Sequence, residues 1–135
     1  MEMMIDFPGG ARVDAHFGSY TVKTDQPPMS GGEGSAPTPF SIFLASMGAC
    51  AGIYVVGFCR HRGLSTDGMR IIQRMHNNPM TGTIDEIEME IQVPESFPSK
   101  YYDALVRSAE QCAVKKALEN PPRFKIHTAA VETVR

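Results

Sequence analysis

The thiols of three cysteines, Cys50, Cys59 and Cys112, are the candidate nucleophiles or redox groups of this sequence. They form no Cys-x-x-Cys pair and no Cys/His cluster with the spacing of zinc ligands, so we expect no metal site. A thiolate can attack an oxidant, whereas a thiol buried among apolar side chains behaves as a small hydrophobic residue. The element around each cysteine therefore decides which kind of chemistry it has.

Cys50 lies in the segment FSIFLASMGACAGIYVVGFC, residues 40–59, whose twenty positions carry no charged side chain. Before it, Thr38 offers a hydroxyl to cap the free amides of a helix. Pro39 suits the first helical position, where a missing N–H is not needed. The pattern predicts a helix from this proline to about His61.

A helix of this length and apolarity could cross a bilayer. It lies, however, between predicted strands of one small domain, and the flanks on either side are each too small to bury a core of their own. We therefore expect a core helix and no membrane contact. The glycines at positions 48 and 52 allow close backbone approach, which suits a helix contact across a two-fold axis, a ligand pocket or ordinary tight packing.

Helical geometry limits which residues could form a disulfide with Cys50 or act as its base. Nine residues separate it from Cys59, which at about 100° per residue places the two thiols on opposite sides of the helix. His61 lies about 16 Å along the axis, too far to act as a base. Cys112 is then the only intrachain candidate for pairing with Cys50. Because Cys50 is also far from the N-terminus of its own helix, we expect any activation to come from a positive side chain elsewhere.

The remaining segments predict a single α+β domain over residues 1–135, with helices covering an antiparallel sheet. Residues 26–39 are rich in Pro, Gly and Ser and predict a long loop. Alternating apolar and polar residues, helix-capping residues and prolines predict the other elements. These are a hairpin over residues 11–25, strands at 69–77 and 84–93, a helix at 99–120 and a last strand at 123–131. Cys112 lies on the apolar face of the predicted helix and is expected to face the interior.

Charge and composition exclude some partners. Lys and Arg number 13 against 15 Asp and Glu, for a net charge of −2, and no basic run marks a nucleic-acid surface. The N-terminal residues MEMMIDFPGG lack the basic start and long apolar run of an export signal. We expect a cytoplasmic protein, in which thiols stay reduced unless chemistry uses them.

Taken together, these segments resemble the OsmC/Ohr superfamily, which comprises osmotically inducible protein C and the organic hydroperoxide resistance proteins. The resemblance spans nearly the whole chain in the right order. It rests on FPGGARVDA near the start, the loop GGEGSAPTP, FLASMGAC in the apolar helix, RHRGL after it and AEQCAVKKAL in the second helix.

The resemblance implies an OsmC-like fold that forms an intertwined homodimer, with two sites at the subunit interface. It also implies thiol-dependent reduction of organic hydroperoxides, without metal or organic cofactor and with an external thiol or dithiol as reductant. Cys50 matches the peroxidatic cysteine and Cys112 the resolving one. Arg12 falls near the position of an N-terminal arginine close to the thiol, one residue away from the tighter Gly-Gly-Arg pattern.

One departure bears on function. Many members carry a glutamate nine or ten residues before the reactive cysteine, where this chain has Phe40 and Ser41. Glu33 could take its place, although a solvated loop charge is the simpler interpretation. Two alternatives to a peroxidase stay open: a non-catalytic thiol protein that binds an apolar ligand or senses oxidants, and a chain whose thiols only pack. Cys59 is expected to fill the core.

Overall fold

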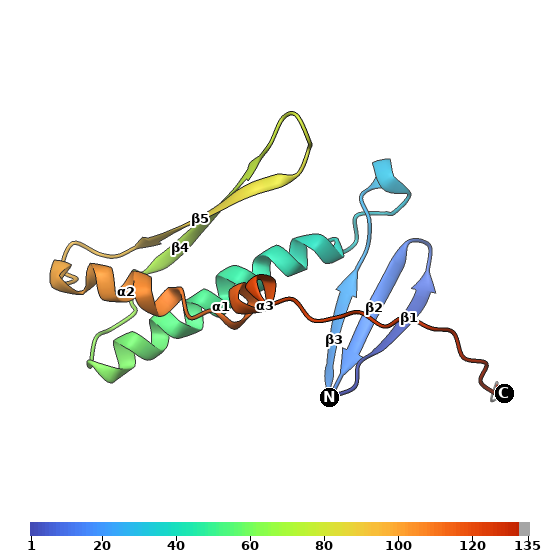
Figure 1. Ribbon diagram of the computed structural model, residues 1–135, viewed down its shortest axis with the longest axis horizontal. Coiled ribbons are helices and arrows are strands. Elements are labelled where there is room, and N and C mark those ends of the chain that lie inside the picture. The colour runs from blue at the N-terminus through green and yellow to red at the C-terminus, as the bar shows by residue number, and fades with distance from the viewer. Residues whose placement is uncertain (133–135) are drawn as a thin grey trace.

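The computed structural model describes residues 1–132 as two antiparallel sheets and three helices, the α+β class that the sequence predicts (Figure 1). A meander of three strands precedes the long helix α1, a hairpin of two strands follows it, and two short helices come last. The elements are β1 (Met4–Gly9), β2 (Arg12–Phe17), β3 (Tyr20–Thr24), α1 (Pro39–His61), β4 (Arg70–Asn77), β5 (Ile84–Gln92), α2 (Tyr102–Ala109) and α3 (Ala113–Glu119).

Helix α1 begins and ends as its local signals predict. The Thr38 side chain accepts a hydrogen bond from the backbone amide of Ser41 at 3.2 Å, and Pro39 occupies the first turn. Beyond the C-terminus, Gly63 adopts φ +64°, a left-handed conformation that glycine tolerates without a side-chain clash. By length and composition α1 could cross a membrane. Here it packs against α2, α3 and β4.

Gly48 and Gly52 of α1 face β4 of the same chain. A Cβ atom at Gly48 would lie 2.5 Å from Oε1 of Gln73, whose Nε2 donates to the carbonyl of Leu44 at 2.9 Å. A Cβ atom at Gly52 would lie 3.9 Å from Cδ1 of Ile71, an ordinary contact. Close helix-to-strand packing therefore requires a glycine at position 48 more than at position 52.

The core lies between α1, α2 and the segment that joins β5 to α2. Its cluster of buried side chains consists of Val55, Phe58, Cys59, Phe97 and Leu105. Cys59 is 0% exposed, and burial raises the pKa of its thiol above the ordinary value. It packs as a small apolar residue, as the sequence predicts.

Three expectations about the elements are wrong. Strand β1 was not expected. Its Pro8 is compatible only with an edge strand, and its conformation depends on pairing with β2. The predicted helix over residues 99–120 is broken between α2 and α3, so that Cys112 lies at the junction. The predicted strand at 123–131 is not formed, because within the described residues no strand pairs with this exposed segment.

Candidate functional site

Cys50 and Cys112 meet where α1 contacts the start of α3. Cys112 is 2% exposed and occupies the N-cap position of α3. Its thiol donates to the carbonyl oxygen of Met47, one turn before Cys50 in α1, at 3.7 Å, and it lies close enough to Cys50 to lower the pKa of that thiol. Cys50 is partly exposed, and all three cysteines of the chain are free thiols. The structure thus brings together the two thiols that the sequence singled out.

The first turn of α3 activates Cys50. The backbone amide of Val114 is the largest cause that lowers the pKa of the Cys50 thiol below its ordinary value, followed by the thiol of Cys112, while the amide of Ala113 adds to them and burial opposes them. Amides in the first turn of a helix lack a partner within that helix and can donate to an anion. The expectation that activation requires a positive side chain is therefore wrong, because backbone donors supply it.

Arg12 occupies a different part of the chain. It is exposed, and its Nε donates to the carbonyl of Gly9 at 3.2 Å, across the turn between β1 and β2. It is not among the groups that shift the pKa of Cys50 within the described residues. A role for Arg12 beside the thiol therefore stays a prediction.

Asp25 organises the loop that leads into α1, a role that no local sequence pattern indicates. Its carboxylate is 1% exposed and accepts backbone hydrogen bonds from Gln26, Glu33 and Ser35 at 2.7, 3.3 and 3.0 Å, besides one from the Ser35 hydroxyl. The Ser35 hydroxyl, followed by the backbone amides, lowers the pKa of Asp25 from 3.8 to about 2. The loop is therefore held by an ionised carboxylate, with the exposed Glu33 at a defined place on it.

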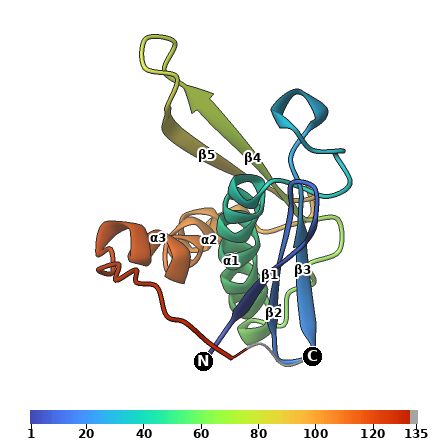
Figure 2. The same ribbon diagram turned by 90° about the vertical axis from the view of Figure 1, so that its right-hand side faces the viewer.

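A cavity of about 380 Å³ opens between α1, the β4–β5 hairpin and the two C-terminal helices. Cys112 forms part of its wall, and Cys50 is not among its lining residues. Apart from Cys112, Glu110 and Lys115, the lining is apolar: Met47, Ala51, Ile71, Ile87, Met89, Ile91, Val106, Ala109 and Leu118. Figure 2, viewed from the side of the β1–β3 sheet, shows α2 and α3 to one side of α1.

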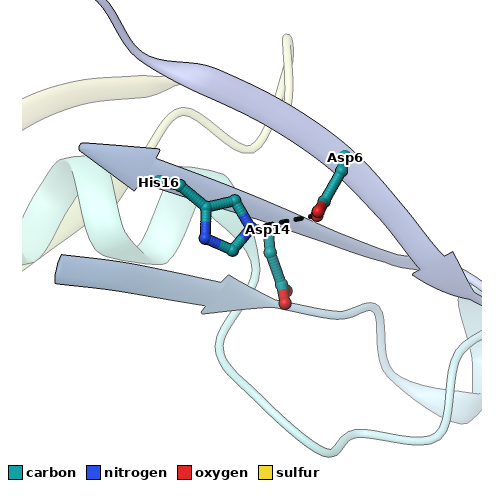
Figure 3. Close-up of side chains that lie close together, drawn as sticks. All are labelled: Asp6, Asp14 and His16. Atoms are coloured by element: carbon teal, nitrogen blue, oxygen red, sulfur yellow. Dashed lines mark ion pairs between the residues drawn. The ribbon is translucent and has the colours of Figure 1, made fainter. Parts of the chain in front are cut away.

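A second group of polar side chains, Asp6, Asp14 and His16, lies on one face of the β1–β2 pair (Figure 3). Each offers a ligand atom of a kind that binds metal ions, and these atoms lie within 4.8 Å of one another. Nε2 of His16 lies 3.2 Å from Asp6, and Nδ1 lies 3.1 Å from the hydroxyl of Thr21 on β3. No local pattern in the sequence marks this group, because only the pairing of β1 with β2 brings Asp6 opposite Asp14.

Solved structures share the fold at low sequence identity. A Psychrobacter arcticus 273-4 protein assigned to the osmotic stress and detoxification response aligns with a TM-score of 0.72 and 20% identity, over 85% of each chain. An OsmC-like protein from Mycoplasma pneumoniae gives 0.60 and 13%, over 89% of this chain and 87% of the other. The organic hydroperoxide resistance protein OhrB of Bacillus subtilis gives 0.51 and 15%, over 90% and 93%.

Sequence comparison gives the family. No curated protein matches the chain significantly. The sequence profile described as OsmC-like protein matches residues 32–127, a range that includes α1, the β4–β5 hairpin, α2, α3 and both thiols of the site. With this match and the shared fold, the chain belongs to the OsmC-like protein family.

Proposed function

We propose that this protein is a thiol peroxidase that reduces organic hydroperoxides, with Cys50 as the peroxidatic and Cys112 as the resolving cysteine. The observation that carries the proposal is a partly exposed Cys50 that lies beside Cys112 and whose thiol pKa is lowered, first by the backbone amide of Val114 and then by the thiol of Cys112. Family membership and the fold shared with an organic hydroperoxide resistance protein support the class of substrate.

The chemistry requires two steps from these residues. The Cys50 thiolate attacks the terminal oxygen of R–O–O–H, forming an S–O bond as the O–O bond breaks, and the alkoxide takes a proton to leave as an alcohol. Cys112 then attacks the sulfur of the Cys50 sulfenic acid, forming the disulfide and releasing water. Because the Cys112 thiol lies close enough to Cys50 to lower its pKa, the second step needs only a small displacement of either side chain.

The surroundings of Cys50 favour an organic substrate. Met47 is 4% exposed, and Phe43 and Tyr54 add partly exposed aromatic surface along α1 near the thiol. An apolar wall of this kind binds an alkyl or aryl group better than it binds hydrogen peroxide. We place this activity in the cytoplasm, where thiol reductants are available.

The amount of exposed surface supports a homodimer. The chain exposes 10721 Å², whereas a compact monomer of this mass exposes about 7000 Å². The excess is about 3700 Å² per chain, or about 7400 Å² for two copies, which is more than the roughly 2000–5000 Å² in total that obligate dimer interfaces commonly bury and is enough to supply one. Within residues 1–132, eight apolar side chains are buried, and none of these belongs to the β1–β3 sheet.

The exposed apolar side chains indicate where a second copy would pack. Those that we place in the dimer contact lie on the meander, along the outer face of α1 and in the C-terminal segment: Ile5, Phe7, Phe40, Ile53, Phe124 and Ile126. Light scattering should give twice the mass of one chain, 14.8 kDa. Ala49→Arg on the outer face of α1 should lower that mass, and Thr81→Arg at the tip of the β4–β5 hairpin should not. A monomeric wild type would contradict the dimer.

A dimer also gives Arg12 a route to a thiol. The hairpin that carries Arg12 contributes no apolar side chain to the core of its own chain, so an approach to Cys50 would occur between copies. A guanidinium there would stabilise the thiolate further and polarise the leaving oxygen. Arg12→Ala should then slow the reaction with hydroperoxide, and Arg60→Ala, an exposed control near the end of α1, should not.

The function itself is tested with reduced protein, an alkyl hydroperoxide and dithiothreitol. Wild type should consume the peroxide catalytically. Cys50→Ser should lose both peroxide consumption and thiol oxidation, whereas Cys112→Ser should form a sulfenic acid that accumulates and over-oxidises. Equal activity in Cys50→Ser would overturn the proposal.

The alternative function is a non-catalytic thiol protein that binds an apolar ligand or senses oxidants. Phe40 and Ser41, in place of the family glutamate, and the apolar cavity favour it. It predicts that Cys50 is oxidised without sustained turnover, or that an apolar dye binds while Cys50 stays unreactive. The same assay therefore separates the two functions.

A further inference from the structure

We propose that a groove between α1 and α2 binds a small organic anion, with a phosphate or carboxylate head on an apolar body, through the guanidinium groups of Arg62 and Arg107. The groove is separate from the apolar cavity described above, with which it shares no lining residue. The proposal does not depend on the peroxidase reaction, because neither thiol takes part in it.

The groove follows the line along which α1 and α2 pack side by side (Figure 1). Its volume is about 520 Å³, which lies within the range of small-molecule sites. Gly57 of α1 lines it, and a Cβ atom built there would meet no atom of another element within 4 Å in residues 1–132. The groove is therefore open along this side of α1 and has room for a ligand.

The charged groups of the groove are all basic. Arg62 and Arg107 line it with exposed guanidinium groups and His61 adds an imidazole, whereas no Asp or Glu of the described residues lines it. The chain as a whole carries more acidic than basic side chains, 15 against 13. Among residues 1–132, none of the three basic groups forms an ion pair. The groove thus gathers positive charge without a balancing carboxylate, which favours an anion there.

Arg62 is held in place before a ligand binds. Its guanidinium carbon lies 3.8 Å from the centre of the Phe58 ring, and its Nη1 donates to the carbonyl of Phe58 at 3.5 Å. A stacked guanidinium presents its other N–H groups as a planar fork, which matches two oxygens of a phosphate or carboxylate. Because Arg62 is already ordered, binding an anion costs little side-chain entropy at this residue.

Uncharged groups add further donors and an apolar wall. The side-chain oxygen of Gln111 accepts a hydrogen bond from Nζ of Lys116 at 2.9 Å, which leaves the amide N–H groups to donate to an anion. The hydroxyl of Ser108 lines the same groove. Tyr54 and Ile53 lie at the end of the groove away from Arg62 and offer apolar surface to the body of the ligand. Ile53 also belongs to the contact that we place between two copies, so a second copy would border the groove at this end.

Binding is tested by titrating isotope-labelled protein with phenyl phosphate and following the backbone amide signals by NMR. The proposal predicts saturable shifts centred on Arg62, Arg107 and Ser108. Phenol has the same ring without the charge and should shift these signals far less. Benzoate carries one charge where a phosphate monoester carries nearly two. Binding of either anion supports the site, and the tighter one identifies the head group. Phenol binding as tightly as both anions, or shifts centred elsewhere in the chain, would overturn the proposal.

Substitutions test the two guanidinium groups. Arg62→Gln and Arg107→Gln each remove a charge-assisted contact at an exposed position, so the protein should fold and bind phenyl phosphate about fivefold more weakly or worse. Arg60→Gln is the matched control, because Arg60 is exposed in the same last turn of α1 and does not line the groove. It should change the Kd by less than about twofold at a salt concentration that screens charges outside direct contact. Equal effects of Arg107→Gln and Arg60→Gln would contradict the proposal.

A carboxylate of a second copy is the alternative occupant. It predicts that Arg107→Gln lowers the mass seen by light scattering and that wild type does not bind phenyl phosphate. That pair of results would assign the groove to a subunit contact and overturn the ligand site. Ser108→Asp, which places a carboxylate in the groove itself, should abolish binding of phenyl phosphate, and unchanged binding in a folded variant would equally overturn it.

Discussion

Replacing Ala113 with proline should weaken the activation of Cys50 without disturbing the fold. Position 113 is the first residue of α3, where proline is favoured. Cys112 before it has ψ 124°, the extended conformation that a residue preceding proline prefers. The substitution therefore removes one backbone N–H that lowers the pKa of Cys50, and leaves the amide of Val114 in place.

The size of the effect follows from the donor that is lost. A hydrogen bond to a charged group contributes about 1.5–3 kcal/mol, and partial exposure of Cys50 screens this to about 1 kcal/mol. Losing it raises the pKa of Cys50, so at a pH below that pKa the thiolate fraction should fall by about fivefold.

The assay is the rate of alkylation of Cys50 by iodoacetamide as a function of pH, assigned to the residue by mass spectrometry. Ala113→Ser keeps the amide and should match wild type. If Ala113→Pro is folded and its pH profile coincides with that of wild type, the amides of α3 do not activate this thiol.

Two further predictions concern stability. Gly52→Ala should stabilise the protein by about 1 kcal/mol, because alanine is the better helix former and its Cβ would meet only Ile71 at 3.9 Å. Gly48→Ala should gain little, because its Cβ would displace Gln73 and cost a hydrogen bond of about 1 kcal/mol. Equal gains in urea unfolding would contradict this packing. The pKa of Asp25 is lowered in the folded chain, so its stabilising contribution is present above pH 3.8 and lost as the pH falls from 3.8 to about 2. Acid titrations of unfolding should show this loss in wild type and not in Asp25→Asn, and identical profiles would refute it.

Local signals in the sequence predict the helix and hairpin that position the thiols. Thr38 and Pro39 mark the start of α1, and alternating side chains mark β5 up to Pro94. The break before α3 has no such signal, since no residue in AEQCAV is a helix breaker. Whether β1 and residues 123–131 form strands depends on pairing with another segment of the chain, and the local residue pattern does not show whether such a partner exists.

The sequence likewise predicts one part of the candidate site, the pair of thiols, and does not predict the groups around it. Helical geometry excluded Cys59 and left Cys112 as the partner of Cys50, and the structure places these two thiols in contact. The activating groups are backbone amides, which every residue except proline carries, so side-chain types do not reveal them. Asp25 was missed for a related reason, because its donors are mostly amides of a loop that folds back on it.

The most direct test of the central proposal is the fate of Cys50 after one equivalent of an alkyl hydroperoxide. Reduced protein is quenched within seconds and its peptides are mapped by mass spectrometry, with the alcohol product measured in parallel. The proposal predicts a Cys50–Cys112 disulfide and one alcohol released for each disulfide formed. Loss of peroxide with Cys50 still a free thiol, or no reaction at all in fully reduced protein, would contradict it.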